Sequence, residues 1–225
     1  MQKPIAILLA RMDSKRLPGK HMLPVGDLPI ISHLLKRLCK GTQYEIVLAT
    51  SDRPVDAPLI EWATDKNLSV FTGDAFDIRK RVIDCALHFQ ASHFARVNAD
   101  SPFVDHLLLD KAFEIMANDK VDLCTNLFPR SFPYGYSVEV FKTTTFVDAL
   151  PFNTELENIT SFFYSHAQQF HIHNISSGVE DLTSLRMTVD TAEDLDIIRS
   201  LFKSHPNLFE FSLDQLVPLF QNTIL

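Results

Sequence analysis

The sequence predicts an α/β fold in which helices cover both faces of a mostly parallel sheet. Apolar runs alternate with segments of helical periodicity up to residue 126, an order typical of successive β-α-β units. The apolar runs, such as PIAILLA at 4–10 and EIVLATS at 45–51, lack the polar alternation of half-exposed strands. Continuous apolar strands indicate a parallel sheet that is buried on both faces.

The first half of the chain carries the expected alternation of strands and helices. Strands are expected at 4–10, 45–51, 68–73, 93–99 and 121–126, and helices at 28–40, 58–67, 75–90 and 105–117. Gly41 supplies a natural stop for the first helix.

The order of elements changes after residue 126. Strands are expected at 137–142, 169–176 and 184–190, and helices at 143–150, 156–169, 191–202 and 211–222. Thr191 is a candidate helix cap, and Pro218 is expected to bend or break the last helix. Because no linker divides the chain, we expect a single domain over 1–225 with an excursion at 127–165.

The composition excludes several classes of protein. The chain has 225 residues, a net charge of −7 and a pI near 5.7, whereas duplex nucleic-acid binders show a broad basic face. No apolar run reaches the roughly 20 residues of a membrane span, and no small-residue cleavage site follows the first apolar stretch. The three cysteines are scattered and suit reduced thiols. We therefore expect a cytoplasmic protein without nucleic-acid or membrane partners.

A cluster of cations follows the first expected strand. The stretch LARMDSKRLPGKHML, at 9–23, contains Arg11, Lys15, Arg16 and Lys20. Ligands of open parallel sheets lie at the carboxyl ends of the strands, so these cations are expected to bind a polyanion. The Walker pattern GxxxxGK[ST] is absent, which leaves side chains as the main phosphate ligands. A solvated basic surface loop is the alternative interpretation.

Seven segments together resemble one known family. They are LARMDSKRLPGKHMLPVGDLPIISHLLKRL (9–38), VLATSD (47–52), DIRKRVIDCA (77–86), ARVNADSPFVD (95–105), RSFPYGYSVEVF (130–141), ENIT (157–160) and LRMTVDTAEDLDII (185–198). In this order they resemble the cytidylyltransferases that activate acidic sugars, such as the CMP-KDO and CMP-acylneuraminate synthetases. The SpsF-like branch is the most similar. The resemblance implies a nucleotide-diphospho-sugar transferase fold, which is Rossmann-like and usually dimeric.

The resemblance also implies which residues bind the nucleotide, here CTP. Those that match the family's triphosphate loop are Arg11, Ser14, Lys15, Arg16 and Lys20. Lys20 and Arg16 are the expected catalytic residues, because cations there would stabilise the charge on a departing diphosphate. The residues that match positions beside the nucleoside are Ala49, Thr50, Ser51 and Arg81. Arg81 on a helix surface is the alternative for that residue.

Two aspartates are the expected Mg²⁺ ligands. Asp100 and Asp190 each follow an expected strand and match the family's metal-binding aspartates. Mg²⁺ prefers one or two carboxylates together with phosphate oxygens and water. Helix capping is the alternative for each aspartate.

The segment RSFPYGYSVEVF is expected to contact the sugar. Arg130 is a candidate clamp for a substrate carboxylate, and Glu139 is a candidate partner of a sugar hydroxyl. A dimer contact would suit the same aromatic residues. The chain also departs from the family pattern at Leu9, Asp13 and Ser137, and a carboxylate at Asp13 should repel a triphosphate unless it faces away or holds a metal.

The sequence therefore predicts a Mg²⁺-dependent cytidylyltransferase that forms a CMP-sugar and diphosphate from CTP and an acidic sugar, for surface polysaccharide biosynthesis. A homodimer is expected. One alternative is a nucleotidyltransferase that uses UTP, GTP or ATP with a sugar 1-phosphate. Another is a non-catalytic nucleotide-binding relative.

Overall fold

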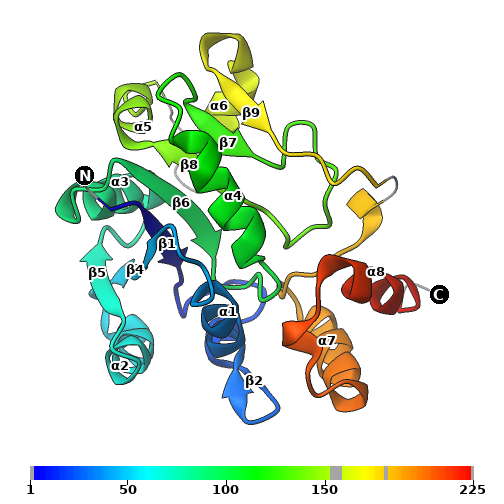
Figure 1. Ribbon diagram of the computed structural model, residues 1–225. Coiled ribbons are helices and arrows are strands. Elements are labelled where there is room, and N and C mark those ends of the chain that lie inside the picture. The colour runs from blue at the N-terminus through cyan, green and yellow to red at the C-terminus, as the bar shows by residue number, and fades with distance from the viewer. Residues whose placement is uncertain (1–2, 153–158, 180–181, 224–225) are drawn as a thin grey trace.

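A seven-stranded sheet forms the centre of the protein (Figure 1). The computed structural model describes residues 3–152, 159–179 and 182–223. The strands in spatial order are β5 (Ser69–Gly73), β4 (Glu45–Ser51), β1 (Ile5–Leu9), β6 (His93–Asn98), β8 (Glu139–Lys142), β7 (Leu123–Thr125) and β9 (Ile172–Asn174). All neighbouring strands are parallel except the two pairs that β8 makes. The expected mostly parallel sheet is confirmed.

Helices cover both faces of this sheet. One face packs against α1 (Ile30–Leu38), α2 (Ala57–Asp65) and α4 (His106–Met116). The other packs against α3 (Ile78–His88), α5 (Thr143–Ala149) and α6 (Ser161–Ser165). Side chains of β1 alternate between the two apolar clusters, so the strand is buried on both sides.

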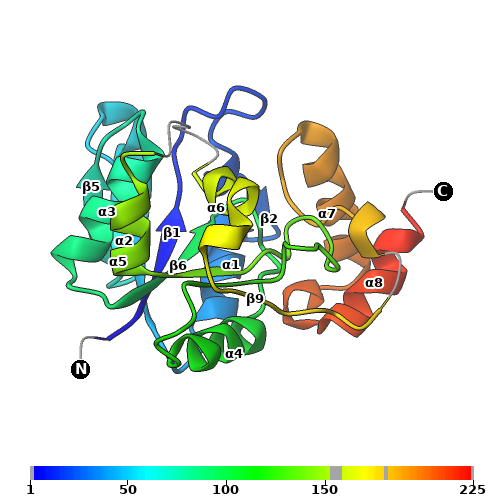
Figure 2. The same ribbon diagram turned by 90° about the horizontal axis from the view of Figure 1, so that it is seen from above.

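The C-terminal part forms a third apolar cluster beside the sheet. It contains α7 (Ala192–Ser204) and α8 (Leu213–Gln221), which pack against Phe103 and the short β2 (Pro24–Val25) and β3 (Leu28–Pro29) region. Figure 2 shows α7 and α8 at the side of the molecule away from α2, α3 and α5. The short 3₁₀ turns are η1 (Lys20–Met22), η2 (Pro54–Asp56), η3 (Ala167–Gln169), η4 (Leu182–Ser184) and η5 (Leu208–Glu210).

The expected strand at 184–190 is wrong. Tyr134 N–H donates to the Leu185 carbonyl, and Met187 N–H donates to the Tyr134 carbonyl, which makes a single bridge rather than a ladder. Val189 N–H then donates to the carbonyl of Asp100 at 2.8 Å. The segment is therefore a loop that crosses the carboxyl end of β6.

Other expectations need smaller corrections. Pro218 does not break α8. The helix continues past the proline to Gln221, and the N–H of Asn222 donates to the Pro218 carbonyl in the last turn. The helix expected at 156–169 is α6 followed by a 3₁₀ turn, and its first residues, 156–158, lie outside the described residues. Within 127–165, β8 lies inside the central sheet between β6 and β7, and the expected excursion over this segment stays a prediction. Among the described helices, none combines the length and apolar character needed to span a membrane.

Candidate active site

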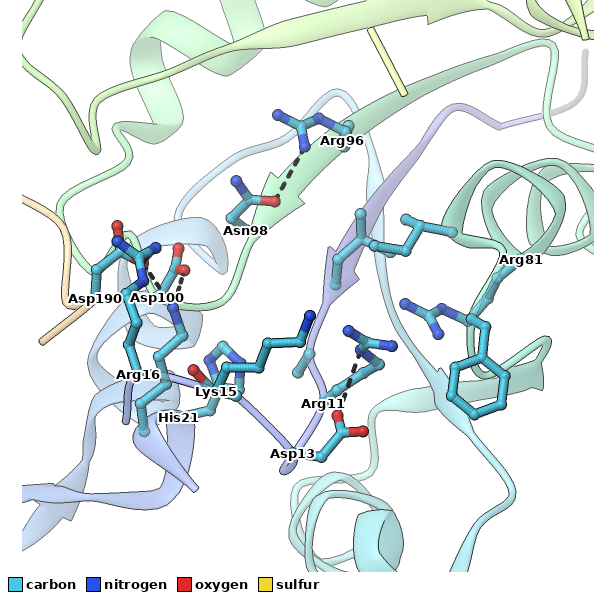
Figure 3. A pocket seen from close by; sticks show the side chains of 16 residues that line it. Arg11, Asp13, Lys15, Arg16, His21, Arg81, Arg96, Asn98, Asp100 and Asp190 are labelled. Atoms are coloured by element: carbon cyan, nitrogen blue, oxygen red, sulfur yellow. Dashed lines mark hydrogen bonds and ion pairs between the residues drawn. The ribbon is translucent and has the colours of Figure 1, made fainter. Parts of the chain in front are cut away.

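A polar pocket of about 640 Å³ opens at the carboxyl ends of β1 and β6. Its cationic lining residues are Arg11, Lys15, Arg16, Lys20, Arg81 and Arg96, and its acidic ones are Asp13, Asp100 and Asp190. Leu9, Ser14, His21, Phe76 and Asn98 also line it. Figure 3 shows Arg16, Asp100 and Asp190 at one end and Arg11, Asp13 and Arg81 at the other. The cavity lining therefore carries more cationic than acidic side chains, although the chain as a whole has a net charge of −7.

The loop after β1 is closed by its own backbone. Gly19 adopts a left-handed conformation with φ of 68°, a conformation that glycine adopts at little cost. Its N–H donates to the carbonyl of Met12 at 2.8 Å. After this turn Lys20 is buried beside Asp100, while Lys15 and Arg16 stay exposed at the pocket.

Lys20 joins the two aspartates expected to bind metal. Its Nζ donates to Asp100 Oδ2 at 2.5 Å and to Asp190 Oδ1 at 2.9 Å. The lysine side chain is 9% exposed and each aspartate side chain is 17% exposed. The three groups thus form a largely buried ionic cluster rather than a solvated surface pair.

The loop at 185–190 places Asp190 beside Asp100. Thr188 Oγ1 and Val189 N–H both donate to the Asp100 carbonyl. Neither aspartate caps a helix: Asp105 is the N-cap of α4, and Thr191 is the N-cap of α7 with a capping box. The capping alternative is therefore wrong for both, and the expected cap at Thr191 is confirmed.

Asp190 also contacts two arginines. Arg16 lies 3.1 Å from its Oδ1, and Arg186 lies 2.5 Å from its Oδ2. Burial alone would raise the pKa of Asp190, but Lys20 and the two arginines hold that pKa below its usual value. Asp190 therefore remains a carboxylate at neutral pH.

Asp100 and Asp190 fit a hard divalent cation. Their oxygens converge on one point, which the Lys20 ammonium marks. No group of three or more His, Cys, Asp or Glu among the described residues is arranged to hold a metal ion. Two carboxylates suffice for Mg²⁺ when substrate phosphates and water supply the remaining ligands.

Arg81 is a buried cation, and one of its N–H groups has no hydrogen-bond acceptor among the described residues. It is 1% exposed, which corrects the alternative of a surface arginine. Its Nη1 donates to the Asp74 carbonyl at 2.8 Å, but its buried Nε has no hydrogen-bond partner among the described residues. Burial, followed by the neighbouring Arg11, lowers the pKa of Arg81 to about 10. Figure 3 shows the two guanidinium groups side by side, an arrangement that an anion between them would stabilise.

Asp13 is paired rather than free. Its Oδ2 accepts from Arg53 Nη1 at 2.7 Å, and its Oδ1 lies 3.6 Å from Arg11 Nε. The Arg53 guanidinium, more than any other group, holds the pKa of Asp13 below its usual value. Asp13 is therefore charged, and that charge is offset by two arginines.

Several expected site residues do not line the pocket. Ala49, Thr50 and Ser51 are fully buried at the end of β4, where Ser51 Oγ donates to the buried Asp56. Ser51 thereby connects β4 to the loop after β1, because Asp56 also accepts from Met12 N–H at 2.7 Å. The contacts expected between these three residues and the nucleotide stay a prediction.

The two expected sugar contacts are also elsewhere. Arg130 lies over the ring of Tyr134 at 4.3 Å and is absent from the pocket lining. Glu139 is 1% exposed, and both of its oxygens are occupied inside the protein. Arg96 Nε donates to one oxygen at 2.9 Å, and the Tyr164 hydroxyl donates to the other at 2.6 Å.

Arg96 and Asn98 were missed by the sequence reasoning. Both line the pocket from β6, and Arg96 Nη1 donates to Asn98 Oδ1 at 3.2 Å (Figure 3). A signal was present, since Arg96, Asn98 and Asp100 alternate at period two near the end of an otherwise apolar strand. Arg53 and the buried His21 were also missed, and their spacing in the sequence carries no comparable signal.

The comparisons with known proteins point to one family. A family model described as Cytidylyltransferase matches residues 5–225. The chain is 26% identical over 230 residues to the spore coat polysaccharide biosynthesis protein SpsF of Bacillus subtilis, covering 97% of this chain and 94% of the relative.

Solved structures show the same similarity. A cytidylyltransferase from Leptospira borgpetersenii superposes with a TM-score of 0.91 at 28% identity, covering 99% of this chain and 95% of the other. A CMP:2-keto-3-deoxy-manno-octonic acid synthetase complexed with CTP superposes with a TM-score of 0.67 at 16% identity, covering 90% of this chain and 99% of the other. The latter similarity concerns the fold alone.

Proposed function

The chain belongs to the cytidylyltransferase family, and from this premise we propose that its pocket binds CTP with Mg²⁺ and transfers the CMP group to an acidic sugar. In the proposed reaction a sugar hydroxyl oxygen attacks the α-phosphorus of CTP. The bond from that phosphorus to the bridging oxygen of the β-phosphate breaks, diphosphate leaves, and the hydroxyl proton is released. Such transfers depend mainly on positioning and on charge neutralisation.

The observation that carries the proposal is the desolvated Arg81 beside Arg11. Two guanidinium groups in one cavity repel one another, and the Arg81 Nε has no partner among the described residues. A nucleotide phosphate between the two guanidinium groups would remove the repulsion and could accept hydrogen bonds from both. Lys15 and Arg16, at the mouth of the same pocket, would meet the other phosphates of the chain.

Lys20, Asp100 and Asp190 form the proposed transfer end of the pocket. A divalent cation at the two carboxylates would supply positive charge to the triphosphate. Lys20 is within hydrogen-bond distance of both carboxylates, so its ammonium would adjoin any phosphate bound there. One preorganised donor of this kind contributes about 3 kcal/mol to transition-state stabilisation. Lys20 and Arg16 are thus the proposed catalytic residues.

Arg96 is the proposed contact for the sugar carboxylate, in place of Arg130. Glu139 and Asn98 fix its Nε and Nη1, so the guanidinium is already oriented before substrate binds. A planar guanidinium with a fixed orientation suits a carboxylate, because it can donate two parallel hydrogen bonds to the two oxygens. An acidic sugar that reaches Arg96 would extend from the phosphate end along β6. A cytoplasmic homodimer remains part of the proposal.

Pyrophosphate release would test this function. Purified protein is supplied with Mg²⁺ and either CTP, UTP, GTP or ATP, each combined with a panel of sugar acids and of sugar 1-phosphates. We expect release only with CTP and a sugar acid, and a loss of about 10²–10³-fold in Asp190→Asn. Asp196→Asn, an exposed change on α7, is the matched control and should behave as the wild type. Release that requires a sugar 1-phosphate and another nucleotide would replace this proposal with the alternative nucleotidyltransferase.

A further inference from the structure

We propose that Arg53 is a positioning residue that neutralises Asp13 and holds its carboxylate so that the pocket can accept a polyphosphate. The inference rests on the proposed function in one respect only, namely that the ligand of the pocket carries several phosphate groups. It explains how a chain with an acidic residue in its phosphate loop can still bind an anion.

Asp13 presents a real obstacle to an anion. It lies in the loop that follows β1, and it lines the same pocket as Arg11 and Lys15. Its side chain is 35% exposed, although Oδ1 is buried, so protein atoms shield the carboxylate from a ligand only in part. An unpaired carboxylate at this position would repel a bound triphosphate and would cancel one of the cations of the loop.

Arg53 removes this obstacle by direct contact. Its Nη1 lies 2.7 Å from Asp13 Oδ2. The low pKa of Asp13, which is caused first by Arg53, is consistent with a tight pair. Arg11 approaches the other oxygen less closely, at 3.6 Å, so that Arg11 can still donate its Nη1 to the Ala75 carbonyl at 2.6 Å.

Arg53 is held from behind by buried groups. Its Nη2 donates to Asp56 Oδ2 at 3.1 Å, and its Nε donates to Ser51 Oγ at 3.0 Å. Asp56 is 0% exposed and accepts Met12 N–H, so it ties the arginine to the backbone of the loop. The guanidinium also lies 5.5 Å from the centre of the Phe76 ring. These contacts fix the orientation of the Arg53 guanidinium, which in turn fixes the Asp13 carboxylate through their hydrogen bond.

Two other roles fit the geometry less well. If Arg53 bound phosphate directly it would line the pocket, but it is absent from the lining residues. If Asp13 were a metal ligand it would face Asp100 or Asp190, whereas Figure 3 shows it at the opposite end, beside Arg11. Both roles make different predictions for the variants below.

The first test is Asp13→Asn, measured by calorimetric titration with inorganic tripolyphosphate and with CTP, both in Mg²⁺. We expect both ligands to bind as tightly as to the wild type or more tightly, because one negative charge leaves the pocket lining while Arg53 stays paired with Asp56. Asp65→Asn, an exposed change on α2, controls for net charge. A loss of about tenfold or more in Asp13→Asn would show that Asp13 binds the metal or the ligand, and would overturn the proposal.

The second test is Arg53→Met with and without Asp13→Asn. The single variant should bind tripolyphosphate at least about tenfold more weakly, and the double variant should recover to within about threefold of Asp13→Asn. Both lack the contacts to Ser51 and Asp56, so recovery isolates the charge of Asp13 from any structural role of Arg53. Lys80→Met is the control for the lost cation. Unchanged binding in Arg53→Met, or a double variant as weak as the single one, would overturn the proposal.

Tripolyphosphate separates this inference from the proposed function. If the wild type binds tripolyphosphate but shows no preference for CTP, the proposed function fails and the role of Arg53 is still decided by the variants. If the wild type binds neither ligand, both fail. Should Arg53→Met not fold, Asp13→Asn still decides the matter on its own.

Discussion

Replacement of Lys20 by Met removes the cation shared by Asp100 and Asp190. The lysine side chain is 9% exposed and lies 2.5 and 2.9 Å from the two carboxylates. Breaking a buried ion pair by removing one partner costs about 3–5 kcal/mol. Arg16 and Arg186 still face Asp190, and Ser101 still donates to Asp100. Because these partners remain, we expect Lys20→Met to lower the free energy of unfolding by only about 2–3 kcal/mol.

Thermal unfolding in EDTA at neutral pH measures this loss. For a chain of this size each kcal/mol lowers the Tm by about 2–4 °C, so Lys20→Met should unfold about 5–10 °C below the wild type. The Asp190 carboxylate has a lowered pKa in the folded protein. Its contribution is therefore present above a pH of about 4 and disappears as the pH falls below that value, so the two proteins should converge in acid.

Divalent cations should affect the two proteins differently. In Lys20→Met the carboxylates no longer share an ammonium, so Mg²⁺ or Mn²⁺ should raise the Tm of the variant more than that of the wild type. Lys111→Met, an exposed change on α4, is the matched control. The reasoning is refuted if Lys20→Met unfolds within about 2 °C of the wild type in EDTA. Equal stabilisation of both proteins by Mn²⁺ would refute it as well.

Three further predictions concern other residues of the pocket. Arg96→Met should raise the KM for the sugar acid about 10–100-fold and leave the Kd for CTP within about threefold, which steady-state kinetics and calorimetry would separate; equal effects on both ligands would contradict the assignment. Phe76, which is 68% exposed and lines the pocket, offers a stacking face, so Phe76→Ala should weaken CTP binding about 5–10-fold and leave tripolyphosphate binding unchanged; a loss for both ligands would exclude stacking on the base. Burial lowers the pKa of His21 to about 4. The free energy of unfolding, measured with a denaturant, should therefore be highest above a pH of about 6.5 and should fall by up to roughly 3 kcal/mol as the pH decreases towards 4. His21→Gln should weaken this pH dependence, and an unchanged pH dependence would assign it to other groups.

Much of the fold could be predicted because hydrophobic periodicity is a local property. The runs at 4–10 and 45–51 are apolar on both faces, and they became β1 and β4, which are buried by helices on both sides. The run at 184–190 alternates polar and apolar residues as a half-exposed strand would, but its backbone bonds to Tyr134 and to Asp100, which are distant in the sequence. Such partners cannot be seen in a local pattern.

The site was less predictable than the fold. The position of the cationic loop follows from the rule for parallel sheets, and the structure brings Arg11, Lys15 and Lys20 to one pocket. The roles expected for Arg130 and Glu139 depended on where side chains point after β8 joins the sheet. That strand is antiparallel to its neighbours, and Glu139 turns inward to Arg96.

The compensation of Asp13 also lay beyond sequence reasoning. Asp13 and Arg53 are separated by 40 positions along the chain, and only the adjacency of β1 and β4 makes them neighbours. Considered alone, Asp13 was therefore expected to repel a triphosphate unless it faced away or held a metal. In three dimensions it is one half of an ion pair.

Calorimetric titration of the wild type with CTP, UTP, GTP and ATP, in Mg²⁺ and in EDTA, tests the central claim most directly. The account predicts that CTP binds most tightly, that EDTA weakens its binding, and that Asp190→Asn abolishes the effect of Mg²⁺ while leaving the metal-free affinity within about threefold. Tighter binding of another nucleotide, or an affinity for CTP that does not depend on Mg²⁺, would contradict the claim that this pocket is a CTP and magnesium site.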